Sequence, residues 1–293
     1  MTKGELVRRE YAVIAGFIER DGDKAYKYIQ ELIDYNANEG VLFRFRPPLE
    51  REIDILESKE IYLCKPSCYD EDDPSDCEIL FDIYDLSRYL ILDVKPEKYV
   101  KFKSSLTKEF YDDVIEKVQN KPAYIELRKK IRDQALISCF SAGYKDYMWE
   151  KYAQNAEGIC LLYSLQELVI NCSSDLKFYP VRYVDDRRNH KEIWFNSKEY
   201  NMEDDPEPEH LKFIVSCLTK EKEPYRKEAE WRLFCDYSSI DEEEKGKKFP
   251  FVIKPKAIIM GKNIDKNLSF KARVEKYAKQ ENICLLGQED IRN

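Results

Sequence analysis

Apolar residues along the chain follow two spacings, and each is typical of one kind of secondary structure. Short, nearly continuous apolar runs favour β-strands, whereas apolar residues three or four positions apart favour helices that pack on one face. The first pattern predicts strands at 41–46, 61–64, 135–140, 158–163, 176–184, 229–236, 249–253, 257–260 and 283–286. The second predicts helices within 5–35, after Pro47, over most of 79–134, and at about 146–155, 209–220 and 266–280.

Strands and helices succeed each other irregularly in this prediction, which favours an α+β fold over a doubly wound sheet. We expect a mixed, mainly antiparallel sheet core in a single domain at 40–293, preceded by a helical N-terminal segment at 1–39. The helical stretch at about 79–134 separates two strand regions, and we expect it to be a helical insertion.

The composition is that of a folded protein with a heavily charged surface, since 43% of the 293 residues are hydrophobic and 36% are charged. The formal net charge of −8 argues against non-specific nucleic-acid binding, which depends on an excess of Lys and Arg. No apolar run approaches the ~20 residues of a membrane span, and the charged N-terminus does not resemble a secretion signal. We therefore expect a cytoplasmic protein with no membrane partner.

Nine cysteines, an odd number, indicate free thiols in a reducing compartment. Cys64, Cys68 and Cys77 form the only cluster worth testing for a metal, but their spacing contains no CxxC pair and the two histidines lie far away. No metal is therefore expected. The sequence also contains no GxGxxG, P-loop, GxSxG or HExxH motif, which removes the nucleotide and hydrolase classes that those motifs mark.

The most informative stretch is Glu228-Ala229-Glu230-Trp231-Arg232-Leu233. On a strand, this alternation places Glu228, Glu230 and Arg232 on one face and the apolar side chains on the other. One interpretation is a ligand cleft in which one carboxylate acts on a hydroxyl or a proton and its neighbour sets the pKa. The alternative is a cross-strand ladder of salt bridges with no chemical role.

An early strand carries two further candidates, Arg44 and Arg46, on the face opposite Phe43 and Phe45. A guanidinium presents a planar set of donors that suits phosphate. Arg46 precedes Pro47 and is therefore expected at the exit of the strand. The alternative is that both arginines pair with the carboxylates of the 228–232 strand.

Helical spacing places Met148, Trp149 and Tyr152 on one face of the segment at 146–155. These side chains would form either an aromatic wall for a flat ring or part of the core. The acidic loop at 70–76 could hold a divalent cation through oxygen ligands, or it is a solvated loop with a helix N-cap at Ser75 or Asp76.

Read in order, several short motifs resemble a bacterial family known as domain of unknown function 2971, whose pattern is YKYR, NDPFD, CFS, MWxxYA, GIC and ExEWR. The resemblance spans about 40 to 262. Four positions depart from the pattern, since Asp72 replaces an asparagine, Ser75 an aromatic residue, Cys64 a serine and Lys151 a histidine. The matching segments in this chain are 42–46, 72–76, Cys139-Phe140-Ser141, 148–153, Gly158-Ile159-Cys160 and 228–232.

The order of these parts is similar, by analogy, to an ADP-ribosyltransferase plan that uses NAD. That analogy implies a catalytic set of Glu230, Glu228 and Arg46, and a cofactor-binding set of Arg44, Trp149, Tyr152 and Arg232. Cleavage of the nicotinamide bond creates an oxocarbenium ion, which a fixed carboxylate stabilises. The family resemblance further implies a toxin or a phage-defence effector.

Two other functions remain open. The same charged cleft would suit a non-catalytic module that senses a nucleotide or dinucleotide or docks the arginine or lysine tail of a protein partner. A metal-dependent nuclease would instead use Asp72, Asp73, Asp76 and Glu230, provided that these carboxylates lie within a few ångströms of one another.

Overall fold

The computed structural model describes residues 40–69, 73, 76–81, 122–171, 176–189, 193–195, 213–236 and 244–291. The helical segment predicted at 1–39 and most of the insertion predicted at 79–134 lie outside these residues. Within the described part, no helix combines the length and the apolar character that crossing a membrane would require.

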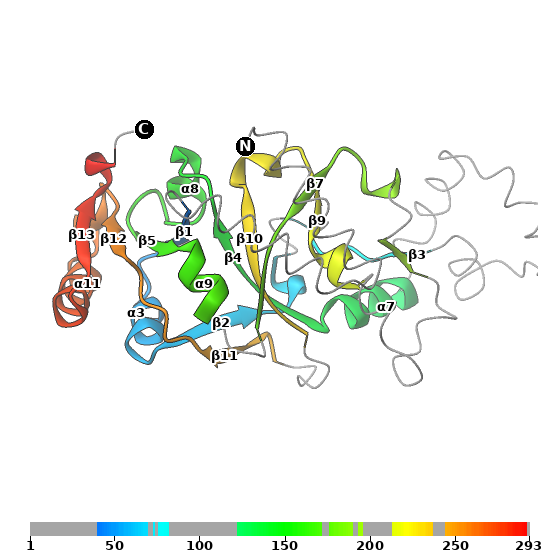
Figure 1. Ribbon diagram of the computed structural model, residues 1–293, viewed down its shortest axis with the longest axis horizontal. Helices are drawn as coiled ribbons and strands as arrows, with labels where there is room; N and C mark the ends of the chain where they lie inside the picture. The colour runs from blue at the N-terminus through cyan, green and yellow to red at the C-terminus, as the bar shows by residue number, and fades with distance from the viewer. Residues whose placement is uncertain are drawn as a thin grey trace, which may run out of the picture.

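A large sheet organises the described part of the chain (Figure 1). Its strands run in the order β11-β2-β4-β1-β5-β12-β13, and β10 pairs with both β4 and β6. All of its pairings are antiparallel except that of β12 with β13. The strands are β1 (Val41–Arg46), β2 (Glu60–Cys64), β4 (Ala135–Ser141), β5 (Ile159–Ser164), β6 (Lys177–Pro180), β10 (Glu230–Asp236), β11 (Gly246–Pro250), β12 (Ala257–Met260) and β13 (Cys284–Gly287).

Two small parallel pairs and several helices complete this architecture. The pairs are β3 (Leu80–Phe81) with β8 (Trp194–Phe195), and β7 (Arg182–Val184) with β9 (Thr219–Glu221). The α-helices are α3 (Glu50–Glu57), α7 (Pro122–Arg132), α8 (Asp146–Lys151), α9 (Leu165–Asn171) and α11 (Leu268–Glu281). The short 3₁₀ helices are η1 (Pro66–Tyr69), η2 (Arg187–Asn189), η4 (Tyr225–Glu228), η5 (Ile264–Lys266) and η6 (Gln288–Asp290). The predicted α+β class with a mainly antiparallel sheet is therefore confirmed.

Several element boundaries differ from the prediction, each for a local reason. The helix predicted at 146–155 ends at Lys151, because residues 154–156 adopt positive φ values of 50°, 55° and 60° that a helix cannot contain. The strand predicted at 176–184 is split into β6 and β7, which belong to different sheets. The strand predicted at 229–236 begins one residue later, because Ala229 is left-handed with φ 44°.

Strand β4 is the branch point of the sheet. It pairs with β10 along its whole length, from Ala135 opposite Asp236 to Ser141 opposite Glu230. By contrast, its register with β1 is a single pair, Phe43 with Ser141, and its register with β2 is the single pair of Cys64 with Ile137. The neighbouring strands therefore diverge along β4, and this divergence leaves room for side chains from several strands to meet.

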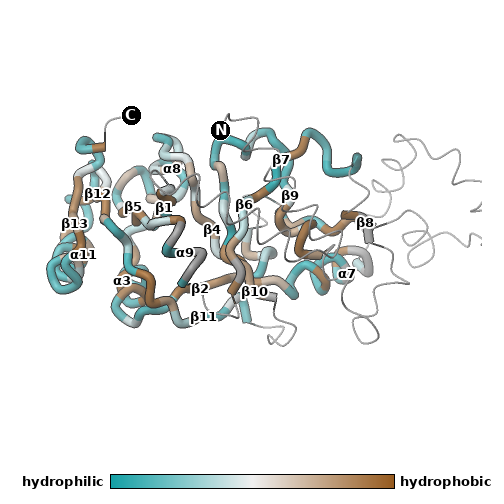
Figure 2. Tube along the Cα trace, in the orientation of Figure 1, coloured by the Kyte–Doolittle hydropathy of each residue, from teal (hydrophilic) through white to brown (hydrophobic). Residues whose placement is uncertain are grey.

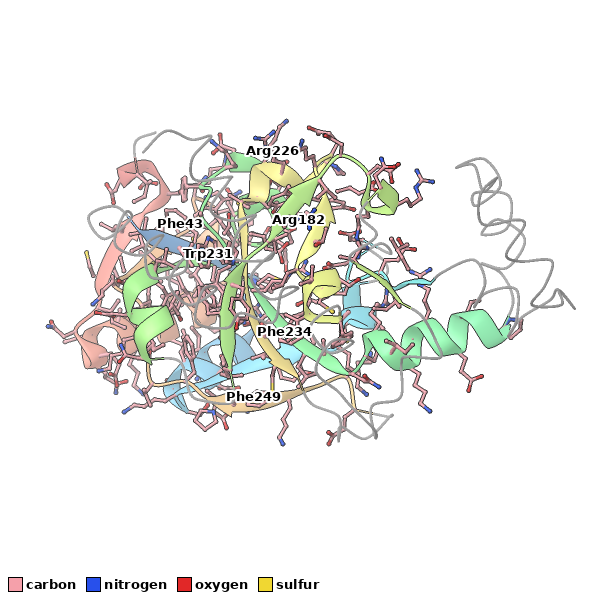
Figure 3. All side chains as sticks on the ribbon, turned by 45° about the vertical axis from the view of Figure 1, so that its right-hand side comes forward. Phe43, Arg182, Arg226, Trp231, Phe234 and Phe249 are labelled. Atoms are coloured by element: carbon pink, nitrogen blue, oxygen red, sulfur yellow. The ribbon has the colours of Figure 1, made fainter. Side chains whose placement is uncertain are left out.

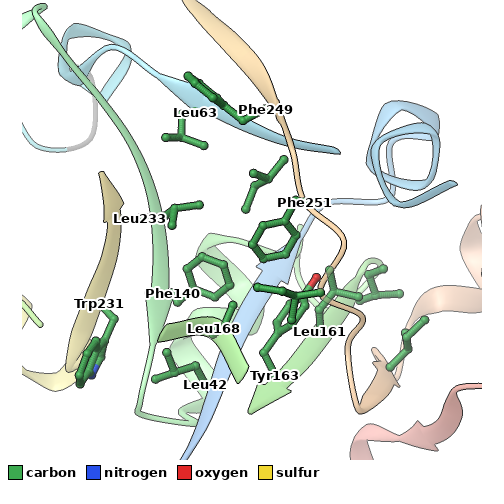
Figure 4. Close-up of a cluster of buried hydrophobic side chains, with 14 of the residues drawn as sticks. Leu42, Leu63, Phe140, Leu161, Tyr163, Leu168, Trp231, Leu233, Phe249 and Phe251 are labelled. Carbon is green, nitrogen blue, oxygen red and sulfur yellow. The ribbon is translucent and has the colours of Figure 1, made fainter. Parts of the chain in front are cut away.

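The main hydrophobic core lies on one side of this sheet (Figure 4). The ring of Phe140 on β4 packs edge-on against Tyr163 on β5 and Phe178 on β6, with centroid separations of 5.6 and 5.4 Å. Burial of side chains of this size contributes roughly 1.5–3 kcal/mol each. Figure 2 shows hydrophobic stretches along the inner strands and hydrophilic stretches on the outer helix α11.

Strand β10 has the two-faced character that its sequence predicts. Figure 3 labels two of its side chains, Trp231 and Phe234. Trp231, Leu233 and Cys235 belong to the main core, and Trp231 stacks on Phe178 with a centroid separation of 5.5 Å. Glu230 and Arg232 occupy the alternate positions and therefore face the other side of the sheet. The strand thus anchors two charged residues by burying their apolar neighbours.

Candidate functional site

A cavity of about 180 Å³ opens where β1, β2, β4 and β10 diverge. Helix α8, the 3₁₀ turn η4, Lys220 of β9 and two aspartates of the acidic loop complete its wall. Its volume lies below the range of roughly 300–1,000 Å³ that is typical of pockets for small ligands. The charged residues on its wall balance one another: Arg44, Arg46, Lys151 and Lys220 against Asp73, Asp76, Glu228 and Glu230.

Arg232 organises the buried side of this cavity although it does not line it. Its Nε donates to Oε1 of Glu230 over 2.8 Å, and its Nη2 donates to Oδ1 of Asp76 over 2.6 Å. Nη1 donates to Sγ of Cys77 over 3.0 Å. The guanidinium is completely buried, so these contacts replace the water that it would otherwise bind.

Lys220 is the second buried cation of this network. Its Nζ lies 3.1 Å from Asp73, 3.3 Å from Glu230 and 4.0 Å from Asp76, and 4.2 Å from the centre of the Tyr225 ring. Sequence reasoning missed Lys220, because no periodicity or motif marks it. Asp73 and Asp76 did carry a signal, since they belong to the acidic loop predicted to hold a cation. The cations that the structure places there are side chains of the protein itself.

Glu228 reaches the cavity from η4 and not from the strand on which the sequence placed it. It is the last residue of the 3₁₀ turn, and left-handed Ala229 separates it from the first strand residue, Glu230. Oη of Tyr152 donates to Oε1 of Glu228 over 2.8 Å, and Nζ of Lys151 lies 3.7 Å from the same oxygen. The predicted shared strand face of three ionisable residues is thus wrong for Glu228, although Glu228 and Glu230 both line the cavity.

The pKa values of the two glutamates are shifted in opposite directions. Burial raises the pKa of Glu228, and the nearby Lys220 and Tyr152 offset this effect only in part. Burial would also raise the pKa of Glu230, but the charges of Arg232 and Lys220 outweigh it and lower the pKa to about 2. Pairs of titratable groups whose environments separate their pKa values are typical of acid–base sites.

The two arginines of β1 also line the cavity, but they have different partners. Nε of Arg46 donates to Oε2 of Glu52 on α3 over 2.6 Å, so its charge is already paired. Nη2 of Arg44 donates to Oγ of Ser138 over 2.8 Å, while its buried Nε has no hydrogen-bond partner among the described residues. Burial and the charge of Arg46 lower the pKa of Arg44. Neither arginine forms an ion pair with Glu228 or Glu230 in the described part of the chain.

The aromatic residues of α8 are divided between core and cavity. Trp149 is almost fully buried in a second core cluster, where it packs edge-on against Phe45 with a centroid separation of 5.2 Å. It does not line the cavity, so its environment matches the core-packing alternative. Tyr152 lies at the end of the same helix and does line the cavity, where it contacts Glu228.

The carboxylates suggested for a metal site do approach one another, but cations of the protein lie between them. Asp73, Asp76 and Glu230 all contact Lys220 within 4.0 Å. Asp72 lies outside the described residues. Among the residues that the structure describes, no group of three or more His, Cys, Asp and Glu side chains has an arrangement that could hold a metal ion.

Comparisons with known proteins give one match. No curated protein and no solved structure resembles the chain closely enough to match. These comparisons therefore lend no support to the ADP-ribosyltransferase analogy. The family model described as "Protein of unknown function (DUF2971)" matches residues 148–233, from α8 to the middle of β10. This segment supplies Tyr152, Lys220, Glu228 and Glu230 to the cavity. The chain therefore carries a DUF2971 domain at residues 148–233.

Proposed function

We propose that the cavity binds a nucleotide and cleaves its N-ribosyl bond, with NAD as the expected substrate, in the manner of an ADP-ribosyltransferase or a related NAD-cleaving transferase. The observation that carries this proposal is the pair of Glu228 and Glu230. They line one cavity, and their pKa values are displaced in opposite directions. We keep the cytoplasm as the expected location, and a toxin or antiviral defence effector as the expected role.

The two carboxylates suit different tasks in such a reaction. When the bond between C1′ of ribose and the ring nitrogen breaks, its electron pair leaves with nicotinamide and positive charge develops on the sugar. Glu230 is held ionised and could stabilise that charge. Glu228, whose pKa is raised by burial, could accept the proton of the attacking hydroxyl group. The nucleophile forms the new bond at C1′, so charge and atoms balance.

Arg44 supplies the reason to expect an anionic ligand. A buried guanidinium without a counter-ion is costly, because desolvation is not repaid by an ion pair. Arg44 donates to the hydroxyl of Ser138 and lies over the face of Phe140, whose centre is 5.4 Å from its Cζ. The carboxylate of Glu52 acts on Arg44 only through its charge and is hydrogen-bonded to Arg46. A phosphate or carboxylate in the cavity would provide a direct ion pair. We therefore propose Arg44 as the main phosphate-binding arginine, because Arg46 is already paired with Glu52.

The size of the cavity limits what can enter it. A volume of about 180 Å³ suits a ring with its ribose better than a complete dinucleotide. We therefore propose that the reacting half of NAD enters between β1 and β10 and that the other half extends beyond the described wall.

The test is NAD turnover by the purified full chain, followed as nicotinamide release by chromatography. Glu230→Gln and Glu228→Gln are each expected to reduce turnover by at least about 100-fold, the usual effect of losing one electrostatic or acid–base group. Arg44→Lys and Arg46→Ala are expected to weaken binding of NAD. Circular dichroism verifies that each variant is folded.

A matched control is Glu150→Gln, since Glu150 is an exposed glutamate on the same helix as Lys151 and does not line the cavity. Its turnover is expected to equal that of the unmodified chain. Full activity in folded Glu228→Gln and Glu230→Gln would reject the enzymatic proposal, as would the absence of nicotinamide release from the unmodified chain with NAD and a range of acceptors.

One observation favours a second candidate, a non-catalytic nucleotide-sensing module. Both oxygens of Glu230 are already engaged, Oε1 by Arg232 and Oε2 by Arg232 and Lys220. A carboxylate held in this way is well placed to fix the cavity wall and poorly placed to contact a substrate. In this case NAD, ADP-ribose or cyclic nucleotides would raise the melting temperature by mass action without being consumed. Nicotinamide release distinguishes the two functions directly.

A further inference from the structure

Two cysteines lie together at the edge of the cavity, where β2 passes into η1. Cys64 is the last residue of β2 and lines the cavity, whereas Cys68 is exposed on the first turn that follows it. The backbone N–H of Cys68 donates to the carbonyl of Lys65 over 3.0 Å, which folds the chain back at this point.

Strand β11 fixes both cysteines against the same short segment. Cys64 is the backbone partner of Gly246, and Sγ of Cys68 lies 3.4 Å from the carbonyl oxygen of Lys245. The N–H of Lys65, between the two cysteines, donates to that same carbonyl over 2.9 Å. Sγ of Cys64 also lies 3.1 Å from Oη of Tyr69. The pair is thus held by sheet and turn contacts and not by chance proximity of two mobile side chains.

The environment gives the two sulfurs different reactivity. Hydrogen bonding with the neighbouring Cys64 thiol, aided by the charges of Lys245 and Lys65 and opposed by burial and by Asp133, lowers the pKa of Cys68 to about 7. The same hydrogen bond and burial raise the pKa of Cys64. Near neutral pH the exposed sulfur therefore has thiolate character, while the shielded sulfur keeps its proton. This combination is typical of an attacking thiolate beside a resolving thiol.

We propose that Cys64 and Cys68 form a reversible dithiol–disulfide switch that responds to peroxides and alters the wall of the cavity. The Cys68 thiolate attacks one oxygen of hydrogen peroxide, the O–O bond breaks, and hydroxide leaves, which oxidises Cys68 to a sulfenic acid. Sγ of Cys64 then attacks Sγ of Cys68, and the hydroxide that departs takes up the proton of Cys64. Two thiols and one peroxide thus give one disulfide and two waters. The new bond draws Cys64 away from Tyr69, and both residues line the cavity.

The test treats the full chain with hydrogen peroxide, blocks the remaining thiols by alkylation, and maps the peptides by mass spectrometry without reduction. The expected product is a peptide pair linked through Cys64 and Cys68 that dithiothreitol separates. Oxidation of Cys68 is expected to be about tenfold faster than oxidation of the exposed Cys284, because attack requires the thiolate. In Cys64→Ser, Cys68 is expected to stop at the sulfenic acid, which dimedone traps.

Cys284→Ser is the matched control, since it removes an exposed thiol from a distant strand and is expected to leave the rate of disulfide formation unchanged. The proposal is overturned if the folded chain gives no Cys64–Cys68 link, if Cys68 proceeds to sulfinic acid without a link, or if Cys68 pairs mainly with another cysteine. None of these readouts requires turnover, so the switch and the proposed enzymatic function fail or succeed separately.

Discussion

Arg232 and Glu230 occupy alternate positions on the same face of β10, and Nε of Arg232 donates to Oε1 of Glu230 over 2.8 Å at a site that excludes solvent. The same guanidinium binds Asp76, which is distant in sequence and belongs to the acidic loop. One cation therefore holds the acidic loop against the strand and keeps Glu230 ionised. The stability of this region and the charge of the cavity consequently depend on the same residue.

Replacement of Arg232 by methionine is expected to lower the free energy of unfolding by about 3–5 kcal/mol, because Glu230 and Asp76 would remain buried with only Lys220 as a counter-charge. Urea denaturation measures this loss. Lys271→Met, which removes the partly exposed partner of the exposed Asp265, provides the comparison and is expected to leave the midpoint nearly unchanged. Equal midpoints for the two variants would show that the buried network contributes nothing to stability.

Because the pKa values of the two glutamates are shifted in opposite directions, their contributions to the stability of the fold are expected to depend on pH in opposite ways. The pKa of Glu230 is lowered from 4.5 to about 2, so its contribution to stability is present above pH 4.5 and is lost as the pH falls toward 2. The pKa of Glu228 is raised, so its contribution is present below pH 4.5 and is lost as the pH rises through its folded value.

Urea denaturation at several pH values measures both effects by difference. The stability gap between the unmodified chain and Glu230→Gln is expected to shrink from pH 4.5 toward pH 2. For Glu228→Gln, the stability of the unmodified chain relative to the variant is expected to fall as the pH rises above 4.5. If the two stability differences changed with pH in the same direction, the assigned environments would be contradicted.

Tyr152 is expected to tune Glu228. Its hydroxyl donates to the carboxylate and therefore favours the ionised form, so Tyr152→Phe is expected to raise the pKa of Glu228 further. Carboxyl ¹³C NMR titration measures the shift directly. Tyr144→Phe serves as the control, because Tyr144 contacts Trp149 in the core cluster and does not line the cavity. An unaltered Glu228 titration in Tyr152→Phe would remove this hydrogen bond from the description of the site.

Gly158 is expected to tolerate no side chain. A Cβ atom at this position would lie 2.0 Å from the carbonyl oxygen of Arg46 and 3.1 Å from the carbonyl carbon of Pro47, so backbone would have to move. Gly158→Ala is expected to destabilise the fold by about 1–3 kcal/mol and to displace the end of β1. Thermal denaturation tests the first effect. Ala142→Gly, at an exposed position after β4, measures the effect of an alanine–glycine exchange on the entropy of the unfolded chain. An unchanged melting temperature for Gly158→Ala would refute the close approach of the Arg46 backbone to Gly158.

The sequence predicted those features that depend on neighbouring residues. The alternation at 230–235 indicated a strand with one apolar and one charged face, and both faces are present. The aromatic and arginine alternation at 41–46 likewise indicated β1 with its ends unchanged. The structure explains why the Gly158-Ile159-Cys160 motif begins with glycine, since the backbone of Arg46 packs directly against Gly158 and leaves no room for a side chain. Local patterns of this kind reflect which side of an element is buried, so they can be read from the chain alone.

By itself, then, the sequence determined the fold class and the two strands that carry the charged residues. Only the tertiary structure decided that left-handed Ala229 moves Glu228 off the strand, that Arg46 is paired with Glu52, and that Trp149 belongs to the core. It also decided that Lys220 and Asp76 complete the network around Glu230 and Arg232. The physical reason is that ion pairing and burial depend on distances between elements far apart in the chain. Arg232 and Asp76 are separated by 156 positions, and no periodicity links them.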